Sequence, residues 1–225
     1  MISASTSAVP VVTIDGPGGA GKGTVASAIA ETKGWHLLDS GALYRIIAVA
    51  GLRQGIPLDD AVALAQLCPR LNIVFGAGSV KVSGDDFTDA IRTEDAGSSA
   101  SIVAALPPVR DAILTLQREF RKAPGLVADG RDMGTVVFPD APVKIFLDAS
   151  AEARAERRYN QLKNKGLGVN LRGLLEQIQE RDARDRERAV APLRPAEDAL
   201  IVDSTQMTID EVVATVMAQL ASKAE

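Results

Sequence analysis

Short apolar runs alternate with longer segments of helical periodicity along most of this chain. Continuous aliphatic and β-branched runs, typical of parallel strands buried on both faces, occur at 11–14, 35–38, 125–128, 143–147 and 199–202. Segments of helical pattern separate most of these runs, and Thr208 with Glu211 forms the signature of a capped helix after the last one. The alternation predicts an α/β fold with a five-stranded parallel sheet flanked by helices.

A different pattern interrupts this alternation between residues 71 and 91. Runs at 71–75 and 80–83, with a weaker one at 87–91, are short, and glycine turns at 76–78 and 84–86 separate them. Short strands with glycine turns between them are typical of antiparallel hairpins. We therefore expect a small antiparallel β subdomain inserted into the α/β core.

The loop at 163–168 combines glycines with lysines and connects two helical segments. Loops of this kind are typical of covers that close over a bound ligand. The pattern predicts a short lid near 157–172.

Composition and charge narrow the classes of function. The chain has 225 residues, 46% hydrophobic and 4% aromatic, which suits one mainly aliphatic α/β core with a peripheral insert. Its formal net charge of −4 argues against general nucleic-acid binding. Residues 150–195 nevertheless hold eleven Lys or Arg against seven Asp or Glu, which favours a bound anion.

Localisation and assembly are predicted from features that the chain lacks. Residues 1–7 have neither the basic start nor the apolar core of a signal peptide, and no apolar run reaches the length of a membrane span. A single cysteine, Cys68, argues against an internal disulfide and fits a reducing compartment. We therefore expect a cytoplasmic protein without a membrane partner and, since no apolar stripe marks an interface, a monomer. The one histidine, His36, lies in an apolar run and is expected to be structural.

A glycine-rich segment at 16–24 follows the first apolar run and precedes the first helical segment. Its glycines allow successive N–H groups to point at one anion, and the helix start adds further N–H groups. Lys22 would reach the β- and γ-phosphates of a nucleoside triphosphate. Gly23 comes directly after the lysine, and the hydroxyl residue, Thr24, comes one position later. This Gly-Lys-Gly-Thr sequence looks like that of the nucleoside monophosphate kinases rather than that of GTPases. The residues expected to bind ATP are Gly16, Pro17, Gly18, Gly19, Ala20, Gly21, Lys22, Gly23 and Thr24. The alternative is a glycine turn before an ordinary helix.

Polar residues also follow the second and third apolar runs, where open α/β sheets place their ligands. Asp39 and Ser40 follow the second run, and Asp129, Arg131 and Asp132 follow the third. Charges at the end of a buried strand are costly to desolvate unless they pair or bind a ligand. We interpret them as part of a second binding site. Two alternatives stay open: Ser40 could only cap the next helix, and the charged residues could form a structural salt-bridge cluster.

Arg181, Asp185 and Arg188 are spaced so that they share one face of a helix predicted over 171–190. We expect the Arg181 face to point at phosphate or ligand and the rest of the helix to carry ion pairs in solvent. The alternative is an exposed helix held by the pairs Glu180 with Arg184 and Asp182 with Arg186, and we expect some of these pairs to form in solvent.

Together these segments resemble the bacterial cytidylate kinase family over about 11–220. The matching motifs are 16–24, 39–45, 91–93, 129–135, 143–148 and 181–188. The resemblance implies a single kinase chain over 1–225, with 9–40 and 107–225 as the core. Residues 41–106 would form the nucleoside-monophosphate-binding region with its inserted sheet near 71–91. One departure is Gly18, which stands where serine is often seen.

The resemblance also implies roles for the matching residues. Ser40, Arg45 and Arg131 would hold the acceptor phosphate, while Ser101, Arg110 and Asp132 would contact the cytosine edge with support from Arg188. Arg181 and Asp185 would lie at the sugar, Asp39 and Tyr44 would belong to the same substrate site, and Arg157 would stack on the ATP base. Mg²⁺ would be held by Thr24 and, through water, by Asp129. The residues expected to act in catalysis are Lys22, Arg131, Arg181 and Arg188.

The implied activity is a phosphotransferase that moves the γ-phosphoryl group of MgATP directly to CMP or dCMP, giving ADP and CDP or dCDP. A kinase for UMP, thymidylate or a sugar acid is an alternative within the same class. A GTPase-type switch is the alternative from another class. It requires an Asn-Lys-x-Asp motif, and here Asn164 and Lys165 are followed by Gly166 and Leu167.

Overall fold

A five-stranded parallel sheet forms the centre of the computed structural model, which describes residues 9–76, 79–164 and 166–223. The strands lie in the order β2-β6-β1-β7-β8, and every pairing between neighbours is parallel. Their bounds are Val11–Asp15 (β1), His36–Asp39 (β2), Leu126–Gly130 (β6), Val143–Asp148 (β7) and Leu200–Asp203 (β8). The five predicted strands are confirmed, with ends that shift by one or two residues.

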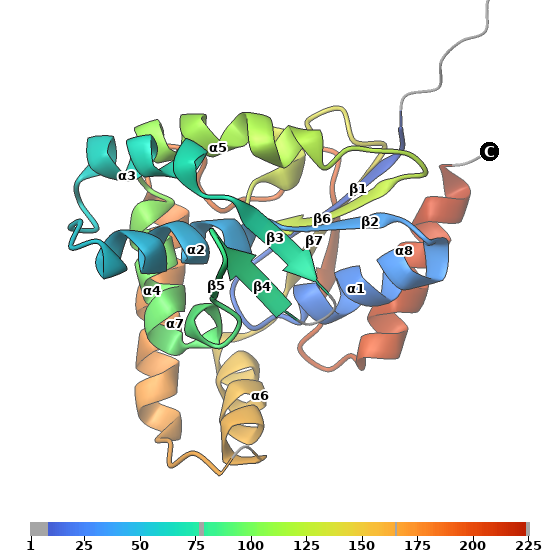
Figure 1. The fold of residues 1–225 in the computed structure, drawn as a ribbon. Helices are drawn as coiled ribbons and strands as arrows, with labels where there is room; N and C mark the ends of the chain where they lie inside the picture. The colour runs from blue at the N-terminus through green and yellow to red at the C-terminus, as the bar shows by residue number, and fades with distance from the viewer. Residues whose placement is uncertain (1–8, 77–78, 165, 224–225) are drawn as a thin grey trace, which may run out of the picture.

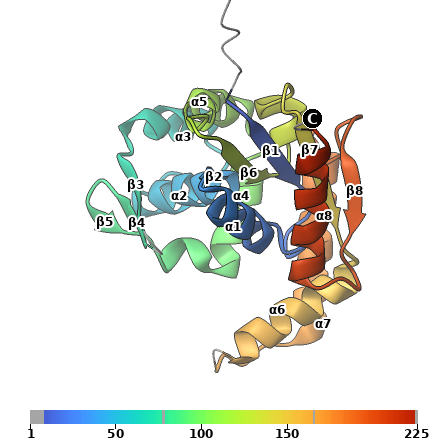
Figure 2. The same ribbon diagram turned by 90° about the vertical axis from the view of Figure 1, so that its right-hand side faces the viewer.

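Helices cover both faces of this sheet (Figures 1 and 2). α1 (Lys22–Lys33) and α8 (Ile209–Ser222) pack on one face. The other face contacts α2 (Ser40–Arg53), α5 (Pro107–Glu119) and a π-helical turn, η3 (Met133–Val137). The capping box predicted at Thr208 is present at the start of α8.

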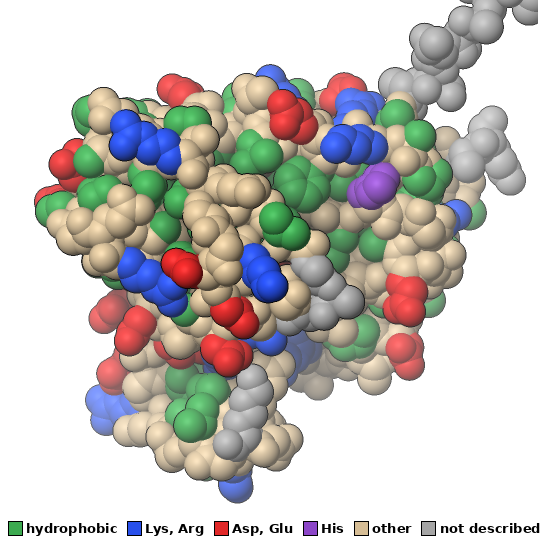
Figure 3. Space-filling model, in the orientation of Figure 1, with side chains coloured by type: hydrophobic (Ala, Val, Ile, Leu, Met, Phe, Trp, Pro, Cys, Tyr) green, Lys and Arg blue, Asp and Glu red, His purple; other side chains and the backbone are tan. Residues whose placement is uncertain are grey.

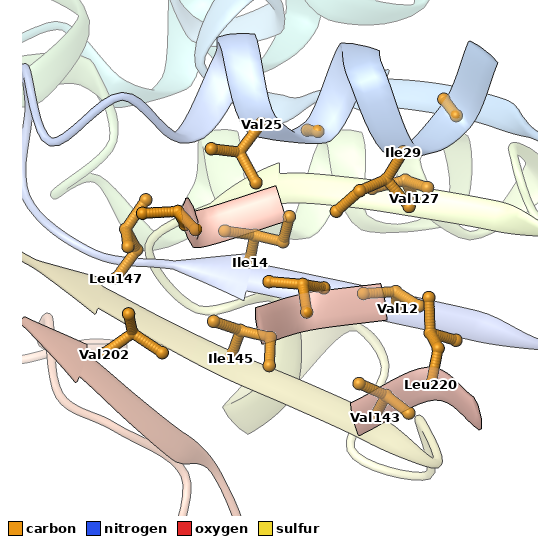
Figure 4. Packing of buried hydrophobic residues seen from close by; sticks show 14 of the residues in the cluster. Val12, Ile14, Val25, Ile29, Val127, Val143, Ile145, Leu147, Val202 and Leu220 are labelled. Carbon is orange, nitrogen blue, oxygen red and sulfur yellow. The ribbon is translucent and has the colours of Figure 1, made fainter. Parts of the chain in front are cut away.

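The side chains of β1 alternate between the two faces of the sheet, so this strand contributes to the core on both sides. Val12 and Ile14 pack with Val25 and Ile29 of α1, as Figure 4 shows, whereas Val11 packs on the opposite face. Successive side chains of a strand point to opposite faces, and full burial of each aliphatic side chain contributes about 1.5–3 kcal/mol. β1 is thereby fixed in the middle of the sheet, and the glycine-rich segment begins directly after its last residue.

A second group of elements lies beside the sheet. It contains α3 (Ala61–Leu67), α4 (Glu94–Val103), two 3₁₀ turns, η1 (Cys68–Arg70) and η2 (Ala90–Arg92), and a small antiparallel sheet of β3 (Ile73–Gly76), β4 (Ser79–Val82) and β5 (Asp85–Asp86). The predicted insert is therefore confirmed. β4 and β5 are joined by Ser83 and Gly84 with φ of 52° and 96°, the positive angles that two-residue hairpins favour. Of the turn predicted at 76–78, residues 77 and 78 lie outside the described residues.

The strand predicted at 87–91 is wrong. The third strand is Asp85–Asp86, in the stretch where a turn was predicted. The Asp86 carboxylate then accepts a hydrogen bond from the Thr88 N–H at 2.8 Å, which bends the chain away from an extended course. Phe87 and Ile91 are both buried, and the Ile91 N–H donates to the Phe87 carbonyl. Their spacing of four is that of a helical turn.

α6 (Ala151–Asn164) and α7 (Leu171–Glu187) form a helical hairpin that projects from the rest of the molecule (Figures 1 and 2). The predicted lid covers the second half of α6 and the connection, in which residue 165 is not among those described. α7 ends three residues before the predicted end, because Arg188 has φ −60° and ψ 138°, outside the helical region.

Two expectations concern features beyond the fold. The predicted absence of a signal peptide rests on residues 1–7, which lie outside the described part of the chain. Among the residues that are described, no single helix is long and apolar enough to cross a membrane. α4 and α5 together reach the length and composition of a span, but the chain bends by 103° between them.

The sheet core gives a direct test of the packing. Ile29→Ala removes a fully buried side chain between α1 and the sheet, and we expect it to lower the free energy of unfolding by about 2–5 kcal/mol. Ile201→Ala is the matched control, since Ile201 is 62% exposed and its truncation should change stability by about 0.5 kcal/mol or less. Urea unfolding measures the free energy of unfolding of both variants. Equal losses of stability in the two would contradict this packing.

Candidate active site

A cleft of about 570 Å³ lies between the glycine-rich segment, the small sheet and the α6–α7 hairpin. Lys and Arg side chains, blue in Figure 3, are visible in the recess above the projecting hairpin. Among the described residues, eight basic and four acidic side chains line the cleft, although the whole chain carries a net charge of −4. The cleft therefore favours anionic ligands. The basic residues are Lys22, Arg45, Arg92, Arg131, Arg154, Arg157, Arg158 and Arg181; the acidic ones are Asp39, Glu94, Asp129 and Asp182.

The glycine-rich segment forms a phosphate-binding loop between β1 and α1. Gly16 has φ 149°, and a Cβ atom there would lie 2.0 Å from the carbonyl oxygen of Leu147, so only glycine fits. Gly21 has φ 94° and stands at the N-cap of α1. The first N–H groups of α1 and its dipole therefore face the cleft at the point where Lys22 begins the helix.

Lys22 is buried at the floor of the cleft. Its Nζ donates to the carbonyl oxygen of Pro17 at 3.0 Å and lies 3.7 Å from Oδ1 of Asp129. Burial, and then the charge of Arg131, lowers the pKa of Lys22 to about 8, while burial raises the pKa of Asp129 to about 6. Burial is the main cause of both shifts, and an anion beside Lys22 would stabilise its charged form.

Three guanidinium groups crowd against the loop and α4. A Cβ atom at Gly18 would lie 3.3 Å from Nη1 of Arg181 and 3.4 Å from Nη2 of Arg131. A Cβ atom at Gly97 would lie 3.2 Å from Nη1 of Arg181 and 3.4 Å from Nη2 of Arg45. Arg181 thus bridges the phosphate loop and α4. Burial, and then the charge of Arg131, lowers the pKa of Arg181 to about 10, and its Nε has no hydrogen-bond partner among the described residues.

A second, smaller pocket adjoins the cleft where β6 ends. Ser101 Oγ donates to Oδ1 of Asp185 at 2.6 Å, and Arg131 Nε donates to Oδ2 of Asp185 at 3.2 Å. Arg110 pairs with Asp132, both almost fully buried. The structure therefore brings together residues predicted from four distant parts of the sequence. Those that line the pocket are Ser40, Gly41, Tyr44, Ala100, Ser101, Ala104, Gly130, Arg131, Asp132, Arg181, Asp185 and Arg188.

Tyr44 and Arg188 complete the polar wall of this pocket. Arg110 Nη1 donates to Tyr44 Oη at 3.2 Å, and burial raises the pKa of Tyr44, so its hydroxyl stays protonated. Arg188 Nε donates to the carbonyl of Ala191, and its Nη2 is buried with no partner in the described part of the chain. A buried guanidinium N–H without an acceptor is a free donor for a ligand.

Ser40 does not cap α2, which excludes that alternative. Asp39 is the N-cap, and its Oδ1 accepts from the Ala42 N–H at 2.9 Å. Ser40 is buried at the first position of the helix, and its hydroxyl accepts from Gln117 Nε2 at 2.9 Å. His36 is exposed on β2, where its Nε2 lies 3.0 Å from the Ala123 carbonyl oxygen, the kind of structural contact expected of it.

Arg154 is the feature of the site that the sequence patterns do not reveal. It is almost fully buried in α6, where Nη1 donates to the Gly18 carbonyl at 3.0 Å and to Oδ1 of Asp182 at 3.0 Å. Its Nε donates to the Ala149 carbonyl at 2.9 Å. Arg154 therefore ties the phosphate loop to both helices of the hairpin. The pair of Asp182 with Arg186 is present, with Nη1 of Arg186 3.6 Å from Oδ2 of Asp182, but Asp182 is buried against Arg154 and not exposed.

The other arginines of α6 reach across the cleft. Arg157 donates to the carbonyl oxygen of Ser204 and lies on the cleft wall. Arg158 pairs with Glu94 in the first turn of α4. This ion pair therefore links the hairpin to α4 at the cleft.

A magnesium site would draw on oxygen ligands near Lys22. Thr24 and Asp129 both line the cleft, and Oδ2 of Asp129 would lie 3.4 Å from a Cβ atom at Gly23, next to Thr24. A hydroxyl and a carboxylate are the ligand types that Mg²⁺ prefers, so these residues fit the ion. Within the described residues, no group of three or more His, Cys, Asp or Glu side chains could hold a metal by itself.

The parallel sheet, the phosphate loop and the cationic cleft define a P-loop nucleotide-binding protein. A family model described as cytidylate kinase matches residues 12–222. The chain therefore belongs to the cytidylate kinase family.

Similar proteins support this assignment. The cytidylate kinase of Aeromonas salmonicida is 61% identical over 213 residues, which cover 93% of each chain. The cytidylate kinase of Pseudomonas aeruginosa strain UCBPP-PA14 is 59% identical over 216 residues, covering 93% of this chain and 94% of that relative. A solved structure of an uncharacterised protein from Eubacterium ventriosum covers 95% of this chain and 99% of its own, with a TM-score of 0.50 and 12% identity, a likeness in fold alone.

The buried Arg154–Asp182 pair gives a test of how the site is held. Arg154→Met leaves Asp182 buried without its main partner, and we expect the free energy of unfolding to fall by about 3–5 kcal/mol. The double variant Arg154→Met/Asp182→Leu removes both charges and should recover at least half of that loss. Chemical unfolding of the wild type, both single variants and the double variant measures the coupling. Strictly additive losses would contradict the pairing.

Proposed function

We propose that this protein transfers the γ-phosphoryl group of MgATP to CMP or dCMP, giving ADP and CDP or dCDP. The observation that carries the proposal is the position of Arg181. Its guanidinium lies against the phosphate loop at Gly18 and against α4 at Gly97, beside both Arg131 and Arg45. Two phosphate sites that share one arginine fit a reaction that moves a phosphoryl group from one to the other.

The donor phosphates would lie on the loop N–H groups and Lys22. Lys22 would exchange its contact with the Pro17 carbonyl for the β- and γ-phosphates. Thr24 and Asp129 would hold Mg²⁺, directly and through water respectively, and Mg²⁺ neutralises charge on the donor phosphate oxygens when it is bound. Arg157 is proposed to cover the ATP base.

The acceptor phosphate would lie between Arg45, Arg131 and Ser40. Planar guanidinium groups can contact a phosphate through two N–H groups each. Because the acceptor phosphate is already ionised at neutral pH, no strong base is required. Catalysis then consists of alignment and of charge neutralisation by Lys22, Arg181 and Arg131.

The cytosine base would occupy the smaller pocket after an opening movement, since the pocket measures only about 40 Å³. Arg110 and Asp132 pair with each other. The guanidinium would offer hydrogen-bond donors to the base, and the carboxylate would offer acceptors. Ser101 would complete contact with the base, with Arg188 in support. Asp185 would receive a sugar hydroxyl.

Residues 41–106 are proposed to act as the acceptor-binding region and 157–172 as the lid. The ion pair between Arg158 and Glu94 supports this division, because it joins the hairpin to α4 across the mouth of the cleft. Closure would exclude water and suppress hydrolysis of ATP. The expectations of a monomer and of a cytoplasmic location stay predictions.

Loss of the loop lysine tests the donor site. Lys22→Ala should lower kcat/KM for CDP formation by about 100-fold or more, since one charge-stabilising contact of the transition state contributes a few kcal/mol. Lys33→Ala, an exposed lysine at the other end of the same helix, is the matched control and should retain wild-type activity. Coupled measurement of ADP formation compares the three proteins. CDP formation by Lys22→Ala at the wild-type rate would overturn the proposed donor site.

A panel of acceptors tests the base site. With MgATP fixed, we expect CMP and dCMP to be phosphorylated with kcat/KM at least about 10-fold above UMP and thymidylate, because a buried polar pocket leaves groups unpaired when the wrong edge enters. A sugar acid should give no ADP above background. Equal rates for CMP and UMP would contradict base selection by Arg110 and Asp132. Tight GTP binding with no turnover of any acceptor would indicate a switch instead.

A further inference from the structure

Asp15 is a buried carboxylate for which the proposed reaction has no direct use. It is the last residue of β1, directly before the phosphate loop, and its exposed fraction is 4%. Val12 and Ile14 point toward α1, so Thr13 and Asp15 point to the opposite face of the sheet, toward η3. Asp15 therefore lies next to the donor loop in the sequence while its side chain contacts the acceptor side of the site.

Each carboxylate oxygen of Asp15 accepts one backbone hydrogen bond. Oδ1 accepts from the Met133 N–H at 2.8 Å, and Oδ2 accepts from the Gly134 N–H at 2.8 Å. These are the first two N–H groups of η3, which lack partners inside a helical turn. Gly134 leaves room for the approach, because a Cβ atom there would lie 2.9 Å from Thr13 Oγ1 and 3.3 Å from Asp15 Oδ2.

The residue that would ordinarily cap this turn is Asp132. It stands at the N-cap position, yet its carboxylate makes no capping hydrogen bond in the described part of the chain and pairs with Arg110 instead. Asp15 caps the turn from a different strand. Asp132 is thereby free to face the pocket, and the adjoining Arg131 is held where it reaches both Asp185 and the phosphate loop.

Burial of this carboxylate is costly. It raises the pKa of Asp15 to about 7, against the two N–H groups that pull it down. Asp132 also raises this pKa, and Lys22 lowers it. A carboxylate kept here at such a cost fits a role in placing the residues that follow β6.

We infer that Asp15 is a positioning residue for the acceptor site, which fixes Arg131 and Asp132 by capping the turn that follows them. The inference deepens the proposed function and rests on it. It predicts that a substitution at Asp15 weakens binding of CMP and leaves binding of ATP unchanged, although Asp15 adjoins the donor loop in the sequence. A merely structural role would lower the amount of active enzyme and change neither KM.

The test compares Asp15→Asn with Thr13→Val in steady-state kinetics of CDP formation, varying CMP and ATP separately. Asparagine keeps the shape, but its NH₂ group faces one of the two N–H donors and leaves it unpaired. We expect KM for CMP to rise at least about 10-fold, the equivalent of one hydrogen bond to a charged group, with KM for ATP within about twofold of wild type. Thr13→Val, on the same strand and face, removes a buried hydroxyl that has no partner among the described residues and should leave both constants unchanged.

Calorimetric titration of CMP in the absence of ATP gives an independent readout and should show the same loss of affinity. If Asp15→Asn does not fold, Gly134→Ala displaces the same turn from its other side and should raise KM for CMP selectively. Unchanged constants in a folded Asp15→Asn, or a larger rise in KM for ATP, would overturn the inference. If the wild type itself does not phosphorylate CMP, the proposed function fails and the inference with it.

Discussion

Positive charge concentrated above the phosphate loop is the constraint on which this structure depends. Guanidinium groups of Arg45, Arg131 and Arg181 approach the loop and α4 so closely that the glycines at 18 and 97 leave little room to spare. Like charges at such range repel unless an anion lies among them. Burial lowers the pKa values of Lys22 and Arg181, and the neighbouring charge of Arg131 lowers them further. A site of this kind gains most from ligands that carry phosphate groups.

Buried carboxylates decide how that charge is arranged. Asp182 holds Arg154 against the phosphate loop, Asp185 holds Arg131, and Asp15 fixes the turn behind Arg131 and Asp132. Pairs of this kind add little net stability but are expensive to break. They therefore act as geometric restraints: the Arg154–Asp182 pair ties the hairpin to the phosphate loop, Asp185 ties α7 to the end of β6, and Asp15 ties β1 to η3. The residues proposed for the donor and acceptor sites are thereby tied to one another near the carboxyl ends of β1 and β6.

Much of this organisation could be predicted from the sequence because it depends on local pattern. Apolar runs located the five strands, and the glycines with Lys22 located the phosphate loop. Local pattern failed at 87–91, where the spacing of Phe87 and Ile91 is helical. It also missed Arg154 and Asp15, because their partners, Asp182 and the N–H groups of η3, are 28 and more than a hundred residues away. The expected roles of the site residues came from resemblance to a family, and the structure adds where those residues meet.

We propose that one cleft holds two phosphorylated nucleotides at once, with Arg181 between them. Calorimetric titration of CMP into protein saturated with Mg²⁺ and a non-hydrolysable ATP analogue tests it most directly. We expect one CMP to bind per chain while the analogue stays bound, because the two phosphate groups would lie on different residues, Lys22 and the loop for one and Arg45 with Ser40 for the other. Competition between the two ligands, so that CMP binds only as the analogue leaves, would contradict it.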